Sequence, residues 1–313
     1  MNWKCIFYIF TSLIIRNMVN KFCILCKHSK FKIVSSQVRD SKYHKVIKCL
    51  KCDHVQLYPI PTPEEDKEFY DKEMQSVGIK YFFSLNELRR LSISDVNRRS
   101  VLIQKTIQKT IQKNKKILEI GSGDGFFLEK MQNYGYKMTG IEVSKQRRTK
   151  SRKTTNVNVL DIDLVQNVPN IGSFDGIVLF HVLEHIRDPI NFLKNILKLL
   201  KPRGKLIVEV PNFNDFQIKL NNAYRDWQYQ RAHIHYFTPN ILKYVFTQAG
   251  LKVNVIGVQR YSIENMFSWK LTGKPQISNP TFSLTKEYEW IEKHYKIQLE
   301  NNLTSDTIVA IGQ

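Results

Sequence analysis

Short apolar runs alternate with amphipathic stretches along most of the chain. Runs with the length and composition of buried strands occupy 117–120, 136–144, 157–160, 176–180, 205–210, 252–258 and 307–312. Between them, apolar residues recur at helical spacing, most clearly in 188–200 and 239–250, and predict helices that pack on a sheet. Strands and helices in alternation are typical of an α/β domain with a parallel sheet. The hydrophobic pattern therefore predicts the α/β class.

The first of these strands ends in a glycine-rich turn. Residues 116–125 read K-I-L-E-I-G-S-G-D-G, and a helix start follows at 126–131. Because glycine lacks a Cβ, the turn can bend sharply and its N–H groups can approach a ligand closely. Glu142 ends the next strand, where a carboxylate in a doubly wound sheet can bind ribose hydroxyls. Such a turn alone also fits a dinucleotide-binding Rossmann domain of another kind.

The order of four motifs makes the interpretation more specific. They are E-I-G-S-G-D-G (119–125), I-E-V-S (141–144), F-D-G-I-V-L-F-H-V-L-E-H-I-R-D-P (174–189) and L-K-P-R-G-K-L-I-V-E-V-P-N (200–212). In this order the chain resembles class I S-adenosylmethionine-dependent methyltransferases, and more narrowly the bacterial small-molecule methyltransferases with an N-terminal zinc ribbon. The resemblance implies a doubly wound, Rossmann-like, seven-stranded sheet whose last strand is antiparallel.

The same resemblance implies the residues that bind S-adenosylmethionine. They are Glu119, Gly121, Gly123, Asp124, Gly125, Glu142, Asp161 and His181. Within this set, Asp161 would accept a hydrogen bond from the adenine amino group, with Asp163 as the alternative. His181 would line the cofactor pocket at the carboxyl end of the fourth core strand, where ligands of open α/β sheets bind.

Two C-x-x-C pairs near the N-terminus predict a metal site. Cys23, Cys26, Cys49 and Cys52 have the paired spacing of a four-thiolate zinc site. A redox pair and an iron–sulfur cluster are the alternatives. Four thiolates close the coordination shell of Zn²⁺, so the metal is expected to be structural. Cys5 lies outside the pattern.

The composition divides the chain into four parts. We expect a zinc ribbon at 18–60, a helical linker at 61–114 and a methyltransferase domain at 115–313, with a substrate-side cover from 212–240 and 259–303. Residues 1–17 contain an apolar run at 5–15 that is too short for a membrane span. We interpret 1–17 as an upstream segment and Met18 as the start of the native protein.

The charge balance is strongly basic. The formal net charge is +20, with 24% charged and 42% hydrophobic residues. Because the lysines are spread along the chain, a solvated surface is favoured over a nucleic-acid site. Five cysteines without a secretory framework fit a reducing compartment, which predicts a cytoplasmic protein without a membrane span.

A segment rich in histidine and aromatic residues, 227–239, supplies the candidate catalytic groups. If the acceptor is a hydroxyl or an acidic carbon, a base must remove its proton. His233 and His235 are the predicted bases, with His185 behind them. The first two can also ligate a metal, but no third ligand is evident. Related deoxysugar C-methyltransferases carry Y-H-E-H here, whereas this chain has A-H-I-H, without the glutamate.

The predicted function is methyl transfer from S-adenosylmethionine to a small molecule, a sugar or polysaccharide precursor such as a nucleotide-sugar. One alternative is an RNA base methyltransferase with a zinc ribbon, although the core lacks an N-P-P-Y motif and a catalytic cysteine motif. The other is a binding module that has kept the fold without the chemistry. The intact glycine-rich turn and Glu142 favour an enzyme.

Overall fold

The computed structural model describes residues 22–71, 84–107, 114–165, 168–276, 284 and 286–313. The apolar run at 5–15, Cys5 and the start expected at Met18 lie outside these residues. Among the described residues, no helix combines the length and the apolar character that crossing a bilayer requires.

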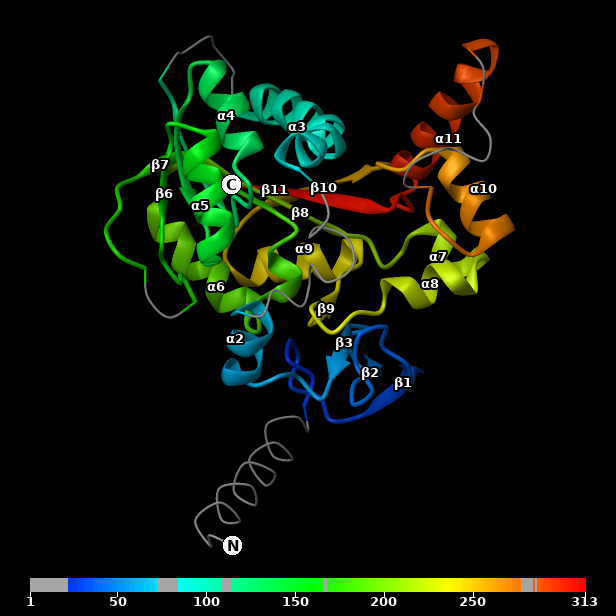
Figure 1. The fold of residues 1–313 in the computed structure, drawn as a ribbon. Coiled ribbons are helices and arrows are strands. Elements are labelled where there is room, and N and C mark those ends of the chain that lie inside the picture. Colours follow the sequence, from blue (N-terminus) through cyan, green and yellow to red (C-terminus); the bar gives the residue numbers. More distant parts are fainter. Residues whose placement is uncertain (1–21, 72–83, 108–113, 166–167, 277–283, 285) are drawn as a thin grey trace, which may run out of the picture.

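A seven-stranded sheet forms the centre of the molecule (Figure 1). The spatial order is β10-β11-β8-β7-β4-β5-β6, and β11 runs antiparallel to both neighbours, as predicted. The strands are β4 (Lys116–Ile120), β5 (Lys137–Ile141), β6 (Asn158–Leu160), β7 (Phe174–Phe180), β8 (Leu200–Pro211), β10 (Val253–Val258) and β11 (Thr307–Gly312). The doubly wound sheet expected from the sequence is confirmed.

Helices cover both faces of this sheet, because successive side chains of a strand point to opposite sides. On β4, Leu118 and Ile120 pack with helices α6 and α9, whereas Ile117 packs with α3 and α4. The covering helices are α3 (Leu85–Ile107), α4 (Phe126–Asn133), α5 (Lys145–Thr154), α6 (Pro189–Ile196) and α9 (Pro239–Gln248). The apolar periodicity of 188–200 and 239–250 therefore corresponds to burial against one face.

One predicted helix is shorter than its pattern suggested. The helix expected over 188–200 ends at Ile196 and continues as a 3-10 turn, Leu197–Leu199. Leu200 already pairs with Phe174 as the first residue of β8, so the chain must leave the helix before it. Pairing within the sheet therefore overrides the helical spacing of the last leucines.

A second, four-stranded sheet contains the cysteine pairs. It consists of β1 (Phe31–Ser35), β2 (Lys45–Cys49), β3 (Val55–Tyr58) and β9 (His235–Tyr236), in that order. The strand β9 comes from the segment expected to cover the substrate, and it pairs antiparallel with β3 through Val55 and Gln56. The ribbon, blue in Figure 1, thus shares a sheet and a small core with the methyltransferase-like part.

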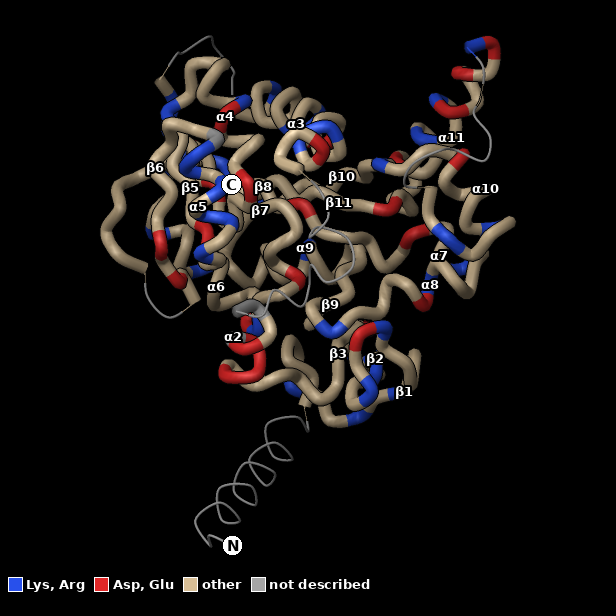
Figure 2. The backbone as a smooth tube through the Cα atoms, viewed as in Figure 1, with Lys and Arg blue, Asp and Glu red and all other residues tan. Residues whose placement is uncertain are grey.

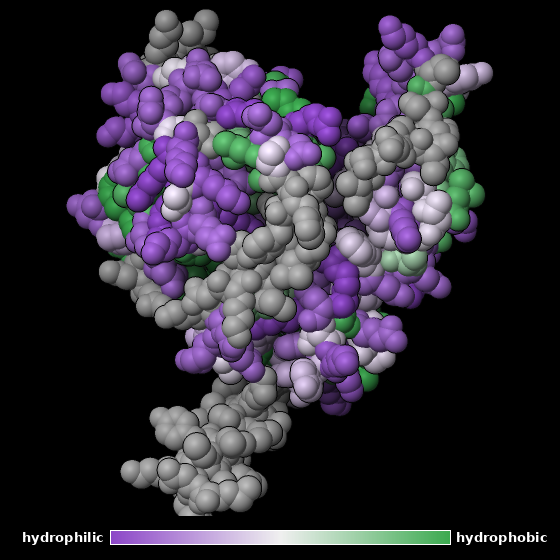
Figure 3. Space-filling model, viewed as in Figure 1, coloured by the Kyte–Doolittle hydropathy of each residue, from purple (hydrophilic) through white to green (hydrophobic). Residues whose placement is uncertain are grey.

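The remaining helices belong to the connections and to the predicted cover. They are α2 (Pro63–Asp71), α7 (Phe216–Leu220), α8 (Asn222–Gln228), α10 (Ile263–Thr272) and α11 (Glu289–Asn301), together with short 3-10 turns at Leu183–His185 and Lys286–Tyr288. The face shown in Figure 3 is mostly hydrophilic, and hydrophobic residues gather over α10, where Phe267 and Leu271 are exposed.

The basic run at 145–153 forms α5 and does not present one charged face. Arg148 is buried, and its guanidinium donates to the backbone oxygens of Glu142 and Val143. Arg152 donates to the backbone oxygen of Val159. Figure 2 shows Lys and Arg distributed over the ribbon, α3 and α5. Part of this charge therefore holds a helix to its neighbouring strands.

Replacing Leu57 by alanine should destabilise the protein by about 2–5 kcal/mol, because it opens a cavity in the core that β3 shares with β9. Leu57 is fully buried, whereas Leu50 in the same ribbon is 57% exposed and provides the control. The free energy of unfolding in urea measures both variants. Equal, small losses for Leu57→Ala and Leu50→Ala would contradict the shared core.

Candidate functional site

The carboxyl ends of β4, β5, β7 and β8 meet at one edge of the main sheet, because these strands are parallel neighbours. The antiparallel strand β11 begins at the same edge, where Thr307 pairs with Pro211. Most residues that the sequence singled out follow these strand ends. The topology therefore gathers them from distant parts of the chain, as expected for a ligand site of an open α/β sheet.

The glycine-rich turn after β4 has the backbone that only glycine adopts easily. Gly121, Gly123 and Gly125 have φ values of 76°, 55° and 84°. A Cβ on Gly121 would lie 2.4 Å from Val182 Cγ2, whereas one on Gly123 would meet no heavy atom within 4 Å. The N–H group of Gly121 donates to the backbone oxygen of Ile141 at 2.8 Å. The turn is thus fixed to β5 and open at its middle glycine.

Two predicted carboxylates lie beside this turn. Glu142 is buried; its Oε2 accepts a hydrogen bond from Gly123 N and its Oε1 accepts one from Ser144 N, both at 2.8 Å. Asp124 lies within the turn and is half-buried. Asp161 follows β6, is largely exposed and pairs with Arg148 at 2.6 Å. The structure brings Glu142 against the glycines and leaves Asp161 at the rim.

Glu119, near the end of β4, has an incomplete environment. It is 4% exposed, and its Oε2 has no hydrogen-bond partner among the described residues. Burial raises the pKa of this carboxyl well above its usual value, which the nearby Arg99 offsets only partly. A buried group without a partner is costly unless a ligand completes it. Its place next to the glycine turn makes it a candidate for contact with a cofactor.

A buried ionic cluster adjoins the predicted site on β7 and β8. Glu209 is fully buried and accepts hydrogen bonds from Arg98 and Arg99 of α3, at 2.6–3.0 Å. Its backbone oxygen accepts from the N–H group of His181, which has a φ of 55°. Burial favours the neutral form of Glu209, but the two arginines and His181 hold its pKa well below the usual range.

The cluster extends to the loop after β10. Arg260 pairs with Asp95 of α3 and places Nη1 3.2 Å from His181 Nε2. The His181 ring also lies 3.4 Å from Glu184 and from Glu209, and these carboxylates raise its pKa although burial alone would lower it. His181 therefore sits at the strand end expected from the sequence, inside an ionic network that the motifs did not reveal.

The three histidines predicted as bases separate into two places. His185 and His233 lie together, with ring centroids 5.1 Å apart, and share their position with the buried carboxylate of Glu184. His235 is 1% exposed on β9; its Nε2 donates to the backbone oxygen of Ile186 at 2.9 Å, and its Nδ1 lies 3.0 Å from His54 Nε2. Both ring nitrogens of His235 are thus engaged. The structure thus places His235 apart from the other two predicted bases.

A polar cluster joins the two segments predicted to cover the substrate. Asp215 and Gln217 belong to the first segment and Tyr295 to the second, and Asp306 precedes β11. Gln217 and the Tyr295 hydroxyl interact with each other, but among the described residues neither they nor Asp306 Oδ1 have a hydrogen bond of good geometry. Burial raises the pKa of Asp215 to about 7, and it also raises the pKa of Asp306. Asp306 Oδ2 accepts from Arg260 N, which links this cluster to the ionic network.

The four ribbon cysteines converge as their spacing predicted. Cys23 Sγ lies 3.6 Å from Cys52 Sγ, Cys26 Sγ lies 3.5 Å from Cys49 Sγ, and all four sulfur atoms lie within 4.8 Å of one another. Zinc–sulfur bonds of about 2.3 Å in a tetrahedron would separate the sulfurs by about 3.8 Å. Each pair is followed by a residue with positive φ, Lys27 or Asp53, so two similar turns present the thiols.

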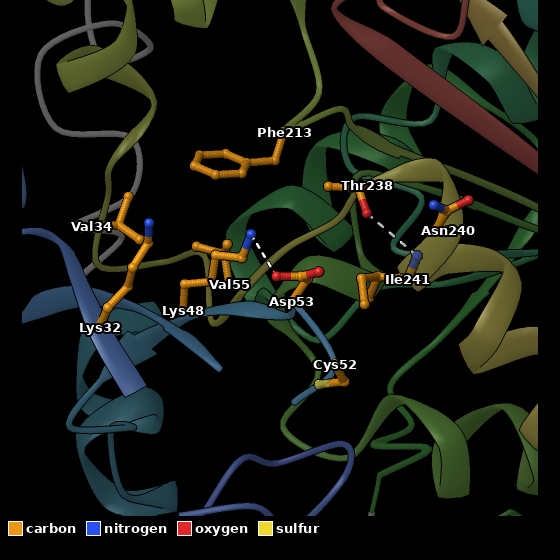
Figure 4. Close-up of a pocket in the computed structure, with 10 residues that line it drawn as sticks. All are labelled: Lys32, Val34, Lys48, Cys52, Asp53, Val55, Phe213, Thr238, Asn240 and Ile241. Carbon is orange, nitrogen blue, oxygen red and sulfur yellow. Dashed lines mark hydrogen bonds and ion pairs between the residues drawn. The ribbon is translucent and has the colours of Figure 1, made fainter. Parts of the chain in front are cut away.

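A cavity of about 400 Å³ lies between the ribbon sheet and the start of α9 (Figure 4). Lys32 and Lys48 line it from β1 and β2, Phe213 lies opposite them, and Asn240 comes from α9. The ion pair between Lys48 and Asp53, at 2.6 Å, neutralises one of the two lysines. Of the residues predicted to act, Cys52 alone contributes to its lining, so this cavity is not the predicted cofactor site.

The chain matches a family of methyltransferase domains over residues 94–255. It is 30% identical over 112 residues to a ubiquinone biosynthesis O-methyltransferase of Coxiella burnetii (strain Dugway 5J108-111), which covers 34% of this chain and 48% of that protein. It is 33% identical over 108 residues to the protein of the same name from Actinobacillus pleuropneumoniae serotype 5b (strain L20). That match covers 31% of this chain and 46% of the other protein. The chain therefore spans about half the length of the curated relatives it matches.

A solved structure, a SAM-dependent methyltransferase from Archaeoglobus fulgidus, gives a TM-score of 0.48 at 17% identity, covering 69% of this chain and 93% of that one.

Replacing Glu209 by glutamine should lower the free energy of unfolding by about 3–5 kcal/mol at pH 7, because Arg98 and Arg99 would lose their buried counter-charge. The folded-state pKa of Glu209 is depressed, so its stabilisation is present above pH 4.5 and is lost as the pH falls below it. The variant should therefore lose less stability than the wild type between about pH 5 and pH 3, as measured by urea unfolding.

The matched control is Glu129→Gln, which weakens a more exposed pair with Arg89 and should cost about 1 kcal/mol or less. If Glu209→Gln proved as stable as Glu129→Gln and kept the wild-type acid dependence, the buried cluster would not hold α3 to the sheet.

Proposed function

The chain belongs to the methyltransferase domain family, whose match covers more than half of it, and we propose that it transfers a methyl group from S-adenosylmethionine to a small molecule. The observation that carries the proposal is the pairing of the glycine turn with Glu142 at the carboxyl edge of the sheet. The curated relatives are named O-methyltransferases, which favours an oxygen acceptor.

The residues at this edge fit the proposed cofactor. The carboxylate of Glu142 suits the ribose hydroxyls, and the backbone at Gly123 leaves space for close approach. Glu119 offers a buried oxygen without a partner among the described residues to the polar methionine end. S-adenosylmethionine supplies an electrophilic methyl group on a sulfonium. The part of this chain is to bind it, to exclude water and to set an acceptor in line at about 3–3.5 Å.

Groups from three parts of the chain surround the proposed acceptor position. Glu184 and His185 follow β7 directly, and His233 reaches the same place from the loop before β9. His181 lies between Glu184 and Glu209 at the end of β7. We place the reacting end of the acceptor beside Glu184, His185 and His233.

We extend the proposal to a sugar or polysaccharide precursor as the acceptor. In support, Gln217, Tyr295 and Asp306 contribute buried polar atoms without a hydrogen bond of good geometry among the described residues, and sugar hydroxyls can donate to and accept from such atoms. They lie on or beside the predicted cover segments and connect through Arg260 to His181. Lys and Arg lie along many separate elements of the described chain in Figure 2, which favours this class over RNA.

We also propose that Cys23, Cys26, Cys49 and Cys52 hold a structural Zn²⁺. The separations of their sulfur atoms match a tetrahedral ion, and Lys51 N donates to Cys49 Sγ at 3.4 Å. Such N–H···S contacts stabilise thiolates around a metal. Because β3 of the ribbon pairs with β9, loss of the ion would disturb the larger domain as well.

Glu142→Ala should weaken the binding of S-adenosylmethionine and S-adenosylhomocysteine by about 10- to 150-fold, the loss of one hydrogen-bonded charge. Isothermal titration calorimetry of the zinc-loaded protein measures the affinity. Transfer of labelled methyl to nucleotide-sugars, phenolic acceptors and RNA measures the activity. The variant should lose transfer in parallel with binding, and Glu289→Ala, which removes an exposed carboxylate on α11, should change neither.

The three kinds of acceptor, tested separately, decide between the parts of this proposal. Labelling of nucleotide-sugars supports the sugar class, whereas labelling of phenolic acceptors alone keeps the methyltransferase and rejects the sugar. Labelling of RNA alone overturns the small-molecule proposal. A well-folded protein that binds neither cofactor form would be a binding module.

Cys49→Ser should lower the zinc content of the purified protein from about one ion per chain to near zero, because three thiolates bind Zn²⁺ much more weakly at a structural site. The midpoint of thermal unfolding should fall with it. Elemental analysis and differential scanning calorimetry provide the two readings. Ser36→Ala, at an exposed residue of the same ribbon, is the control. A full zinc content in Cys49→Ser would reject the four-cysteine site.

A further inference from the structure

We propose that Glu184, His185 and His233 form a second metal site, which binds a divalent first-row transition-metal ion distinct from the ribbon zinc and holds an oxygen of the methyl acceptor on it. Metal binding at these residues is independent of the proposed function. The contact with the acceptor rests on that function.

The fold brings the three side chains together from two segments. Glu184 and His185 lie in the 3-10 turn that follows β7, and His233 precedes β9. A backbone hydrogen bond of 2.9 Å from Ile234 N to Glu184 O holds the two segments in register. One ligand atom from each side chain lies within 4.8 Å of the others. Metal bonds of about 2.0–2.2 Å require these atoms to draw in slightly around a shared ion.

The carboxylate of Glu184 is the strongest sign of a missing partner. It is 1% exposed, and neither of its oxygens accepts a hydrogen bond from the described residues. His181 Nδ1 lies 3.4 Å from Oε1 and can form an ion pair with it. This pair offsets part of the cost of burying the carboxylate, but neither oxygen has a hydrogen bond of good geometry within the described residues. A cation between Glu184 and the two histidines would supply the missing partner.

The tautomer of His185 is the one that a metal ligand needs. Its Nδ1 lies 2.7 Å from the backbone oxygen of Ala232, and because a carbonyl can only accept, Nδ1 carries the proton. In the neutral ring, the lone pair is then on Nε2. A histidine ligand typically donates its other N–H group to a carbonyl or carboxylate in this way, which orients the ring toward the metal.

His233 faces the other two side chains from the loop before β9. Its ring centroid lies 5.1 Å from that of His185, and its nearest ligand atom lies within 4.8 Å of those of Glu184 and His185. The side-chain amide of Gln230 lies 3.0 Å from Nε2 and 3.3 Å from Nδ1, and it helps to hold the ring in this place.

The donor set defines the class of metal. Two imidazole nitrogens and one carboxylate oxygen suit Zn²⁺, Fe²⁺, Co²⁺ or Mn²⁺ and leave coordination positions for other ligands. An acceptor with a hydroxyl or carboxylate oxygen can fill such a position, and the ion then fixes its orientation. The ribbon site has four thiolates and no such opening. The two sites therefore differ in chemistry as well as in place.

Cobalt titration of full-length protein produced with Co²⁺ in place of Zn²⁺, so that the ribbon site stays filled, tests this inference. The thiolate site should give intense sulfur-to-cobalt charge-transfer absorption, and a second equivalent should bind with weak d–d bands alone. Glu184→Gln and His233→Ala should each lose the second equivalent, or at least tenfold in its affinity. Both should keep the thiolate bands. His294→Ala, an exposed histidine on α11, should retain both equivalents.

The outcomes separate this proposal from the proposed function. Binding of a second equivalent of Co²⁺ that requires Glu184 and His233 supports the site even if no methyl transfer is found. Absence of that equivalent from folded wild-type protein overturns the site, even where S-adenosylmethionine binds. If transfer occurs, its KM for the acceptor should rise in Glu184→Gln with cofactor affinity unchanged. Full transfer by protein that carries only the ribbon metal would reject the acceptor contact.

Discussion

The buried carboxylate of Glu209 constrains much of the structure around it. An ionised group inside a sheet persists only when it is paired and hydrogen-bonded, and here α3 supplies both partners, Arg98 and Arg99. The backbone of Glu209 also holds that of His181, whose side chain then contacts Arg260. One charge on β8 thereby couples the docking of α3, the turn after β7 and the loop after β10. His181 connects this cluster to Glu184, which lies at the proposed acceptor position.

The ribbon is joined to this framework by hydrogen bonds as well as by apolar packing. The strand β9 adds main-chain hydrogen bonds to β3, and His235 connects His54 of the ribbon to the backbone of Ile186. Ile186 follows the turn that carries Glu184 and His185. The ribbon therefore supports the segments on either side of the proposed second metal site. A metal ion in the ribbon would therefore stabilise the proposed site indirectly, through these contacts, while lying outside it.

The sequence predicted the features that depend on local pattern. The succession of strands and helices along the chain, the glycine turn and the pairing of the cysteines follow from periodicity and spacing, whereas the arrangement of the sheet followed from the family resemblance. Their boundaries shifted where pairing within the sheet took precedence, as at Leu200. The ionic cluster was missed because its members are far apart in the chain. The one local signal was Glu209 itself, a charge within the apolar run L-I-V-E-V.

The histidines show why spacing alone was insufficient. His233 and His235 would share one face if both lay in a strand, but β9 begins at His235, so the two rings diverge. Of the two, only His233 lies beside Glu184 and His185, which come from another segment. This grouping also addresses the chemistry of an oxygen acceptor. A divalent cation held by Glu184, His185 and His233 would lower the pKa of an acceptor hydroxyl bound to it. The convergence of two imidazoles and a buried carboxylate is the reason why we propose these histidines as ligands rather than as bases.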